Sequence, residues 1–352
     1  MTRRSALALG AGGLLLATST NRSSSADLLP STIRLIQGGN VGGSYDRYSR
    51  VFAAAVAELR PPMRIVVEPM PRANGRLAAR LLMGAVPDGA TIGTFQTSLV
   101  YSELLGDDGV AFELAKLGWI GAFNVEPRIL VASARLGIET LAALRERTSA
   151  VPVGTDTMTS VGTREPLLLN TLLGTRLRPV AGYNTAVRNM ALVSGEIGAA
   201  TASIDAVHPL IVSGDVRALL RLDRHAAAPP LDKLPTLHDL AATDRTSPVF
   251  AFLDAHARLG RWLCMPPGAS PLLLAAWRAL FTDVVGSAAF MRSARAAGLA
   301  EHGTTIVSGP EIESALADIF NARAAMAGAL KAALACGQQI ADTGQRCGSP
   351  PR

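Results

Sequence analysis

The sequence is short of the residue patterns that most often mark an enzyme or a metalloprotein. Its five histidines are scattered, and it contains no H-x-x-x-H, H-E-x-x-H, G-x-S-x-G or C-x-x-C spacing. We expect the histidines to be surface or capping residues, and Asp107-Asp108 between Gly106 and Gly109 to form a turn rather than a metal site. No residue is marked for catalysis, so we expect a protein that is not an enzyme and needs no cofactor or metal.

Long blocks of one charge and long apolar runs are also missing. The formal net charge is +6 and no long Lys/Arg block occurs, which argues against a nucleic-acid partner. Hydrophobic residues make up 49% of the chain, yet no uninterrupted run of 18 apolar residues follows the first 26 positions. We therefore expect a soluble globular chain, and its length makes two domains the default.

The first 26 residues have the order typical of a secretory signal peptide. A basic start, Met1 to Arg4, precedes an apolar stretch from Ala6 to Ala17, and Ser24-Ser25-Ala26 offers small residues for cleavage. The apolar stretch is too short to span a membrane, and the paired arginines leave both general secretory and twin-arginine export open. The first cysteine is Cys264, so no lipid-modified cysteine can follow the signal. We expect cleavage near Ala26 and a periplasmic protein.

The pattern of residues 32–52 predicts a strand, a glycine-rich loop and a helix that begins near Ser44. Glycines in the loop let backbone amides approach a ligand closely, and a helix amino end presents unpaired donors, which together suit an anion. Ser44 follows Gly43 where a P-loop would need lysine, and no G-x-G-x-x-G starts here. The alternative is a tight turn with a Ser or Asp cap.

Motifs along the chain resemble one receptor family. Gly42-Gly43-Ser44-Tyr45-Asp46, with Arg50 four residues on, looks like the first loop of the extracytoplasmic solute receptors of tripartite tricarboxylate transporters, the TctC or Bug family. The likeness covers about residues 31–322 and continues in order through Val66–Pro71, Val86–Thr94, Gly118–Gly121, Leu168–Asn170, Leu173–Thr175, Gly182-Tyr183 and Pro266–Pro271. It implies a two-lobe α/β fold of the periplasmic-binding-protein (venus-flytrap) type, each lobe a mainly parallel sheet flanked by helices.

Hydrophobic patterning agrees with that architecture, because short β-like runs alternate with helical patterns. We expect strands at 33–37, 64–68, 91–95, 129–132, 151–154, 177–180, 197–201, 216–220 and 262–265. We expect helices near 44–59, 75–84, 139–147, 161–173, 185–194, 249–259, 270–285, 287–297 and 310–335. The resemblance implies that the last part completes the first lobe, which gives lobe one as 28–128 plus 246–335, lobe two as 129–245 and a tail at 336–352.

The candidate site is a carboxylate site between the lobes, built from loops that follow strands. Hydroxyl and amide groups ahead of a helix suit a carboxylate. In lobe one the candidates are Gly42, Gly43, Ser44, Tyr45 and Asp46, followed by Thr94, Gln96, Thr97 and Ser98. In lobe two they are Thr155, Asp156, Thr157, Ser160 and Thr163, and the resemblance points to Asp46 and adds Tyr183. The alternative for the lobe-two stretch is a capped loop that faces solvent.

One departure from the resemblance adds Arg72 to the candidates. Arg72 and Asn74 stand where the resemblance leads us to expect glycine. Asn tolerates a left-handed conformation, so the turn itself can survive. A guanidinium at the rim could grip both oxygens of a second carboxylate, which would favour a dicarboxylate. The alternative is that Arg72 points to solvent and its stem covers apolar surface.

We therefore expect a monomeric binding protein that delivers a small organic acid to a membrane permease. The alternative is a periplasmic sensor subunit that feeds a signalling receptor, and an enzyme comes third. Because the expected compartment is oxidising, we also expect Cys336 and Cys347, eleven residues apart, to be the pair able to form a disulfide, and Cys264 to be a buried apolar residue.

Overall fold

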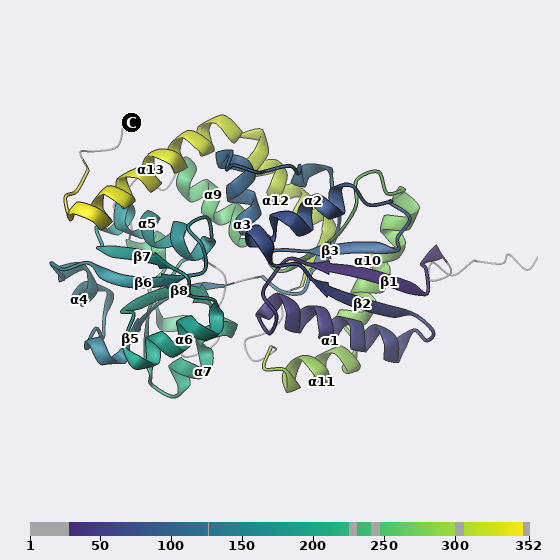
Figure 1. The fold of residues 1–352 in the computed structure, drawn as a ribbon, viewed down its shortest axis with the longest axis horizontal. Helices are drawn as coiled ribbons and strands as arrows, with labels where there is room; N and C mark the ends of the chain where they lie inside the picture. Colours follow the sequence, from purple (N-terminus) through teal and green to yellow (C-terminus); the bar gives the residue numbers. More distant parts are fainter. Residues whose placement is uncertain (1–27, 126, 225–230, 241–246, 300–305, 348–352) are drawn as a thin grey trace, which may run out of the picture.

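The computed structural model describes residues 28–347 except 126, 225–230, 241–246 and 300–305. The expected signal peptide lies outside these residues. Two α/β lobes lie side by side, each built on one mixed sheet with helices on its faces (Figure 1). The predicted two-lobe fold is confirmed.

Lobe one holds a six-stranded sheet in the order β11-β4-β10-β3-β1-β2. β1 pairs in parallel with β2 and β3, whereas β10 lies antiparallel between β3 and β4. The strands are β1 (Thr32–Gln37), β2 (Arg64–Pro69), β3 (Thr91–Thr94), β4 (Gly118–Ala122), β10 (Trp262–Met265) and β11 (Val307–Ser308). The helices are α1 (Ser44–Leu59), α2 (Arg76–Met83), α3 (Ser98–Leu105), α9 (Pro248–Ala257), α10 (Pro271–Val285), α11 (Ala288–Ala296) and α12 (Gly309–Asn321).

Lobe two holds a five-stranded sheet in the order β7-β6-β8-β5-β9. β6 is parallel to β7 and β8, and β5 runs antiparallel between β8 and β9. The strands are β5 (Arg128–Ser133), β6 (Val151–Thr155), β7 (Leu177–Ala181), β8 (Ala199–Ser203) and β9 (Val216–Arg221). The helices are α4 (Leu141–Glu146), α5 (Val161–Leu173), α6 (Thr185–Ser194), α7 (Ile204–Val212) and α8 (Leu237–Leu240). β8 starts and ends two residues later than expected, because Ala199–Ser203 is a fully buried run of small residues without alternation.

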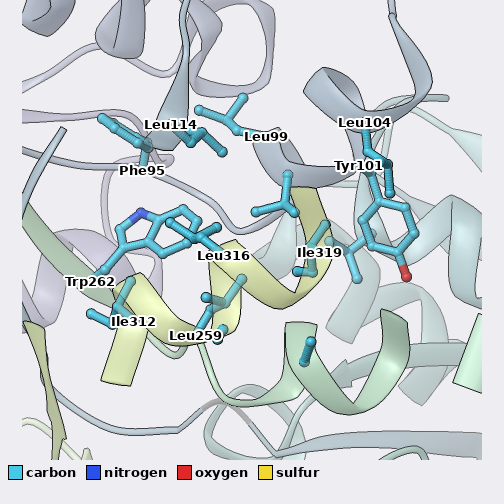
Figure 2. Close-up of a cluster of buried hydrophobic side chains, with 14 of the residues drawn as sticks. Phe95, Leu99, Tyr101, Leu104, Leu114, Leu259, Trp262, Ile312, Leu316 and Ile319 are labelled. Carbon is cyan, nitrogen blue, oxygen red and sulfur yellow. The ribbon is translucent and has the colours of Figure 1, made fainter. Parts of the chain in front are cut away.

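A cluster of buried hydrophobic side chains lies between α3 and α12 in lobe one (Figure 2). Trp262 of β10 packs its ring against Phe95 at a centroid distance of 6.1 Å and against Trp119 at 4.7 Å. Burying a large side chain of this kind contributes about 1.5–3 kcal/mol. The loop after β3, which follows Phe95, therefore leaves the sheet from a rigid base.

The end of the chain differs from the prediction of one helix over 310–335. Two helices are present, α12 and α13 (Arg323–Thr343), separated at Ala322, where φ is −100° and ψ is 20°. α13, the yellow helix of Figure 1, continues past 335 and packs along α5 of lobe two. A Cβ on Gly337 would lie 1.9 Å from the carbonyl oxygen of Leu167, so the two helix backbones touch here and only glycine fits.

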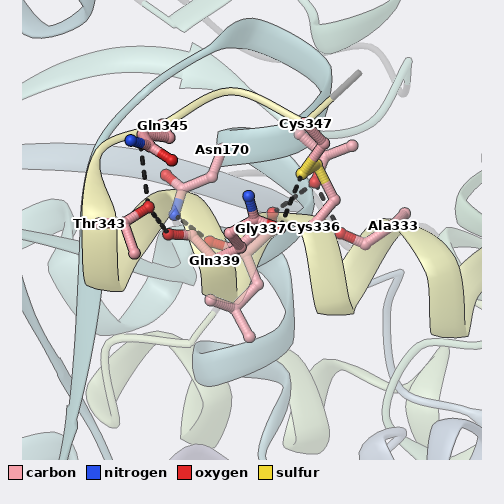
Figure 3. Close-up of a disulfide and its surroundings, with 10 residues drawn as sticks. Asn170, Ala333, Cys336, Gly337, Gln339, Thr343, Gln345 and Cys347 are labelled. Atoms are coloured by element: carbon pink, nitrogen blue, oxygen red, sulfur yellow. Dashed lines mark hydrogen bonds between the residues drawn. A yellow bond between two sulfur atoms is a disulfide. The ribbon is translucent and has the colours of Figure 1, made fainter. Parts of the chain in front are cut away.

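A disulfide joins Cys347, in the segment after α13, to Cys336 of that helix (Figure 3). Nearby, Asn170 Nδ2 of α5 donates to the carbonyl oxygen of Gly337 at 3.1 Å. Cys264 is a free, fully buried thiol. Both cysteine predictions are confirmed.

Two histidines correct the expectation of surface or capping positions. His238 and His256 are buried, and they contact Asp254 at 2.8 Å and the carbonyl oxygen of Thr97 at 3.2 Å. Both rings pack against Phe side chains, His238 against Phe250 at a centroid distance of 4.8 Å and His256 against Phe252 at 5.5 Å.

Within the described ranges, no single helix is long and apolar enough to cross a membrane. Helices α10 and α11 taken together have the length and apolar composition of a membrane span, but they are bent by 63° relative to each other.

Candidate functional site

A cavity of about 150 Å³ lies between the lobes, where loops from both sheets meet. Its walls follow the carboxyl ends of β1 and β3 in lobe one and of β6, β7 and β8 in lobe two. This is the edge at which open α/β sheets bind ligands, because the loops there converge. Ten of the sequence candidates line it: Gly43, Ser44, Tyr45, Gln96, Thr97, Ser98, Thr155, Asp156, Ser160 and Tyr183.

The first loop is shaped by its own side chains. Gly42 has φ of +75°, a left-handed conformation that favours glycine, whereas Gly43 at φ −70° is the N-cap of α1. Asp46 Oδ2 accepts from the Gly42 amide and from Arg50 Nε, each at 3.0 Å. Asp46 is almost fully buried and not part of the cavity wall, so it holds the loop while Gly43 and Ser44 face the cavity.

The turn after β2 places its two unusual residues on opposite sides. Asn74 adopts a left-handed conformation with φ of 56°, as its tolerance allows, and Ala73 does so too at 52°. Asn74 Nδ2 points inward and donates to Ser98 Oγ at 2.9 Å. Arg72 is exposed and outside the cavity wall, which is the placement of the solvent-facing alternative.

The lobe-two loop is cross-linked by its own hydroxyls. Thr155 Oγ1 lies 2.6 Å from Ser160 Oγ and 2.8 Å from Thr163 Oγ1. Thr163 Oγ1 donates to the Thr157 carbonyl oxygen at 2.7 Å. Thr157 and Thr163 are not part of the wall and support it through this bond, and Thr94, at the end of β3 in lobe one, is buried and also not part of the wall.

The lobes touch each other at the rim of the cavity. Asn40 Nδ2 of lobe one donates to Asp156 Oδ2 of lobe two at 3.1 Å, and Arg76 Nη2 donates to Thr159 Oγ1, also at 3.1 Å. These two hydrogen bonds hold the lobes together beside the cavity.

Tyr183 contributes its ring to the wall and directs its hydroxyl outward. The hydroxyl donates to Glu196 Oε1 at 2.6 Å, and this hydrogen bond raises the pKa of Tyr183. The ring packs over Gly154, where a Cβ would lie 3.1 Å from the ring carbon Cγ.

Two arginines that sequence reasoning missed line the cavity. Arg128, the first residue of β5, is paired with Glu165 of α5 through Nε–Oε1 at 2.9 Å and Nη2–Oε2 at 2.7 Å. Arg188 is the fourth residue of α6. The position of Arg188 in the sequence could have indicated a functional role, because a cation near the amino end of a helix is disfavoured by the helix dipole. Polar groups also missed are Asn40, Asn74, Thr185, Thr201 and Ser203.

The electrostatics of the cavity suit an anion. α1, α3, α5, α6 and α7 all begin at its wall and present amide donors there. Two guanidinium groups add full positive charge, while Asp156 is the one carboxylate among the lining residues. In the described part of the chain, no group of three or more His, Cys, Asp or Glu side chains could hold a metal ion.

Solved structures share this architecture. A TctC solute-binding protein from Polaromonas, solved without ligand, matches with a TM-score of 0.62 at 19% identity over 85% of this chain and 98% of its own. The chain has the fold of the TctC solute-binding proteins. MatC from Rhodopseudomonas palustris, solved with malate, matches at 0.62 and 20% identity over 88% of this chain and 98% of its own. Another R. palustris protein, solved with adipate, matches at 0.65 and 20% over 84% and 97%.

No protein-family model and no curated protein matches the sequence. The resemblance to the TctC fold stated from short motifs is confirmed by structure, at identities where sequence similarity alone is faint.

Proposed function

We propose that this protein is a periplasmic solute-binding protein that captures a small carboxylate between its lobes and delivers it to a tripartite tricarboxylate-type permease. The observation that carries the proposal is the cavity itself, where amino ends of helices from both lobes converge with two arginine side chains. The fold is shared with a TctC solute-binding protein and with two R. palustris proteins that were solved with malate and adipate, and this supports the class of ligand.

The chemistry of capture follows from the groups present. Main-chain amides at the amino ends of three helices, at Ser44–Tyr45, Thr97–Ser98 and Val161–Gly162, would hold carboxylate oxygens. A charge-assisted hydrogen bond contributes about 1.5–3 kcal/mol, so three or four of them support micromolar binding, roughly −8 kcal/mol, after the costs of association and closure. Because the wall comes from both lobes, a ligand that contacts both stabilises the closed form.

A thermal-shift screen of mono-, di- and tricarboxylates, each beside its neutral amide, tests the proposal. Ligand present at 100 times its Kd adds about 2.7 kcal/mol of stability, so binding acids should raise the Tm clearly while the amides should not. Ala206, which lines the cavity, offers a matched control, because Ala206→Phe should fill the space and abolish the shift. If no acid shifts the Tm, or if the amides act equally, the proposed function is wrong.

Delivery and location have their own tests. The periplasmic fraction should contain the chain without its first 26 residues by intact mass. Uptake of the acid identified in the screen should be lost when this chain alone is deleted and should return with the wild-type chain. Recovery of the uncleaved chain from the cytoplasm only would contradict the proposed location.

A further inference from the structure

Arg188 is held in the cavity wall by its neighbours on α6 and α7. Its Nε and Nη2 atoms donate to Asn189 Oδ1 at 3.3 Å and 3.1 Å. Asn189 Nδ2 in turn donates to the Ala206 carbonyl oxygen at 2.7 Å, which ties this pair to the first turn of α7. The guanidinium therefore has a fixed direction rather than a free swing.

The charge of Arg188 is not matched by a carboxylate partner. Among the described residues Arg188 makes no ion pair, whereas the charge of Arg128 is matched by the two oxygens of Glu165. The carboxylate of Asp156 accepts instead from Asn40 of lobe one. The cavity wall thus contains one cation to which no carboxylate of the described residues is directly paired.

Two further effects make this position unfavourable for a cation. Arg188 is the fourth residue of α6, at the end of its first turn, where the helix dipole is still positive. Although part of its side chain keeps some exposure, desolvation and, to a smaller extent, the charge of Arg128 lower the pKa of Arg188 to about 10 against the opposing effect of Asp156. Arg188 remains protonated at neutral pH, and its surroundings disfavour this charge when no ligand is bound.

A second group on the same wall also lacks a partner. Thr201 of β8 is 1% exposed, lines the cavity, and its Oγ1 has no hydrogen-bond partner among the residues described. Buried polar atoms without a partner are rare in folded proteins and point to a missing water or ligand. Thr201 and Arg188 lie on different elements, so the two observations are independent.

We propose that Arg188 is the specificity-determining residue of the lobe-two wall and that it receives a second acidic group of the ligand. This inference rests on the proposed function and deepens it. One carboxylate lies at the amino ends of α1 and α3 in lobe one, and the other faces Arg188 and Thr201. A cavity of about 150 Å³ has room only for a small molecule, so we expect a short aliphatic diacid.

Arg188 takes the role that the sequence predicted for Arg72, which is to bind a second carboxylate. Arg72 is exposed and outside the cavity wall, whereas Arg188 brings the same guanidinium into it. Arg72 is therefore the matched control, because removing it takes away an equal charge from the same protein.

Calorimetric titration with succinate, glutarate and adipate, each beside its monoamide, tests the inference. Wild type should bind at least one diacid at least tenfold more tightly than its monoamide. Arg188→Gln should reduce this ratio to about twofold or less by weakening the diacid, and Arg72→Gln should leave it unchanged. Arg188→Lys should recover part of the ratio, because it keeps the charge and loses the planar fork.

The stability of the unliganded variants separates specificity from a structural role. Arg188→Gln should keep the Tm of wild type or raise it, because the cation opposes its surroundings when no ligand is bound. A lower Tm together with an unchanged diacid-to-monoamide ratio would overturn the inference in favour of a structural arginine. If wild type binds acids but Arg188→Gln leaves the ratio as it was, or if no diacid of this series binds, the inference fails alone. If no carboxylate of any kind binds wild type, the proposed function fails with it.

Discussion

Arg128 and Glu165 form a two-fold hydrogen-bonded ion pair in the wall of the cavity, with N–O distances of 2.9 Å and 2.7 Å. Arg128 is the first residue of β5, directly after the crossover from lobe one, and Glu165 lies on α5. The Arg128 amide also donates to Asp223 Oδ2 at 2.8 Å. The pair therefore fixes the point where the chain enters lobe two and sets the charge of one side of the cavity.

Breaking this pair should destabilise the protein strongly. The Arg128 and Glu165 side chains are only 15% and 4% exposed, so Glu165→Gln removes a buried carboxylate that faces a largely buried guanidinium. We expect the free energy of unfolding to fall by about 3 kcal/mol in urea titrations at pH 7. Glu139→Gln is the control, because its pair with Arg217 is exposed and should change stability by less than about 1 kcal/mol. Equal effects of the two substitutions would contradict this account.

A side chain on Gly43 should damage the first loop at the cavity wall. A Cβ there would lie 3.0 Å from the Asn40 carbonyl oxygen, which accepts from the Gly43 amide. We expect Gly43→Val to reduce carboxylate affinity at least tenfold by moving this backbone. Its φ of −70° is open to any residue, so the loss comes from crowding and not from a forbidden dihedral angle. Normal folding and normal binding of Gly43→Val would show that the loop is only a turn.

The cysteines give a count that chemistry can check directly. Cys336 and Cys347 are bridged and Cys264 is free and buried, where desolvation raises the pKa of its thiol. We expect one titratable thiol per chain in denaturant without reductant, none accessible under native conditions, and three after reduction. Peptide mapping that finds Cys336 and Cys347 unlinked in protein isolated from the periplasm would refute the bridge.

The start of α12 should make part of the stability depend on pH. Hydrogen bonds from the Ser308 hydroxyl and amide lower the pKa of Glu311 below its ordinary value of 4.5. A pKa lowered by folding means that the stabilisation is present above pH 4.5 and is lost as the pH falls through the folded value. Glu311→Ala should therefore lower the Tm at pH 7, and the difference from wild type should shrink between about pH 4.5 and pH 3. In a Ser308→Ala background the effect of Glu311→Ala should be smaller, and a constant difference at all these pH values would contradict the assignment.

Elements with strong local patterns could be predicted from the sequence. The helix 185–194 and the strand 262–265 match α6 and β10 at both ends, because Asn184 caps the helix and the strand is a short apolar run. The break at Ala322 could not be predicted, since neither proline nor glycine marks it and packing of α13 on lobe two decides it. Tertiary packing here overrides a continuous helical pattern.

The candidate site shows the same division. Cavity-lining residues in loops that follow strands, such as Ser98 and Thr155, can be predicted from the sequence because glycines and hydroxyls mark such loops. Arg128 and Arg188 were missed because they stand inside a strand and a helix, where only the fold turns them toward the cavity. The place of Arg72 in a loop after a strand predicts contact with the ligand, whereas in the structure Arg72 is exposed to solvent.

The most direct test of the central claim is a crystal structure of the protein grown with the acid that raises its Tm most. We expect that acid in the cavity between the lobes, with one carboxylate at the amino ends of α1 and α3 and contact to Arg188 on the other side. Density for the acid elsewhere on the protein, with the cavity filled by water alone, would contradict the claim that this cavity is the carboxylate site.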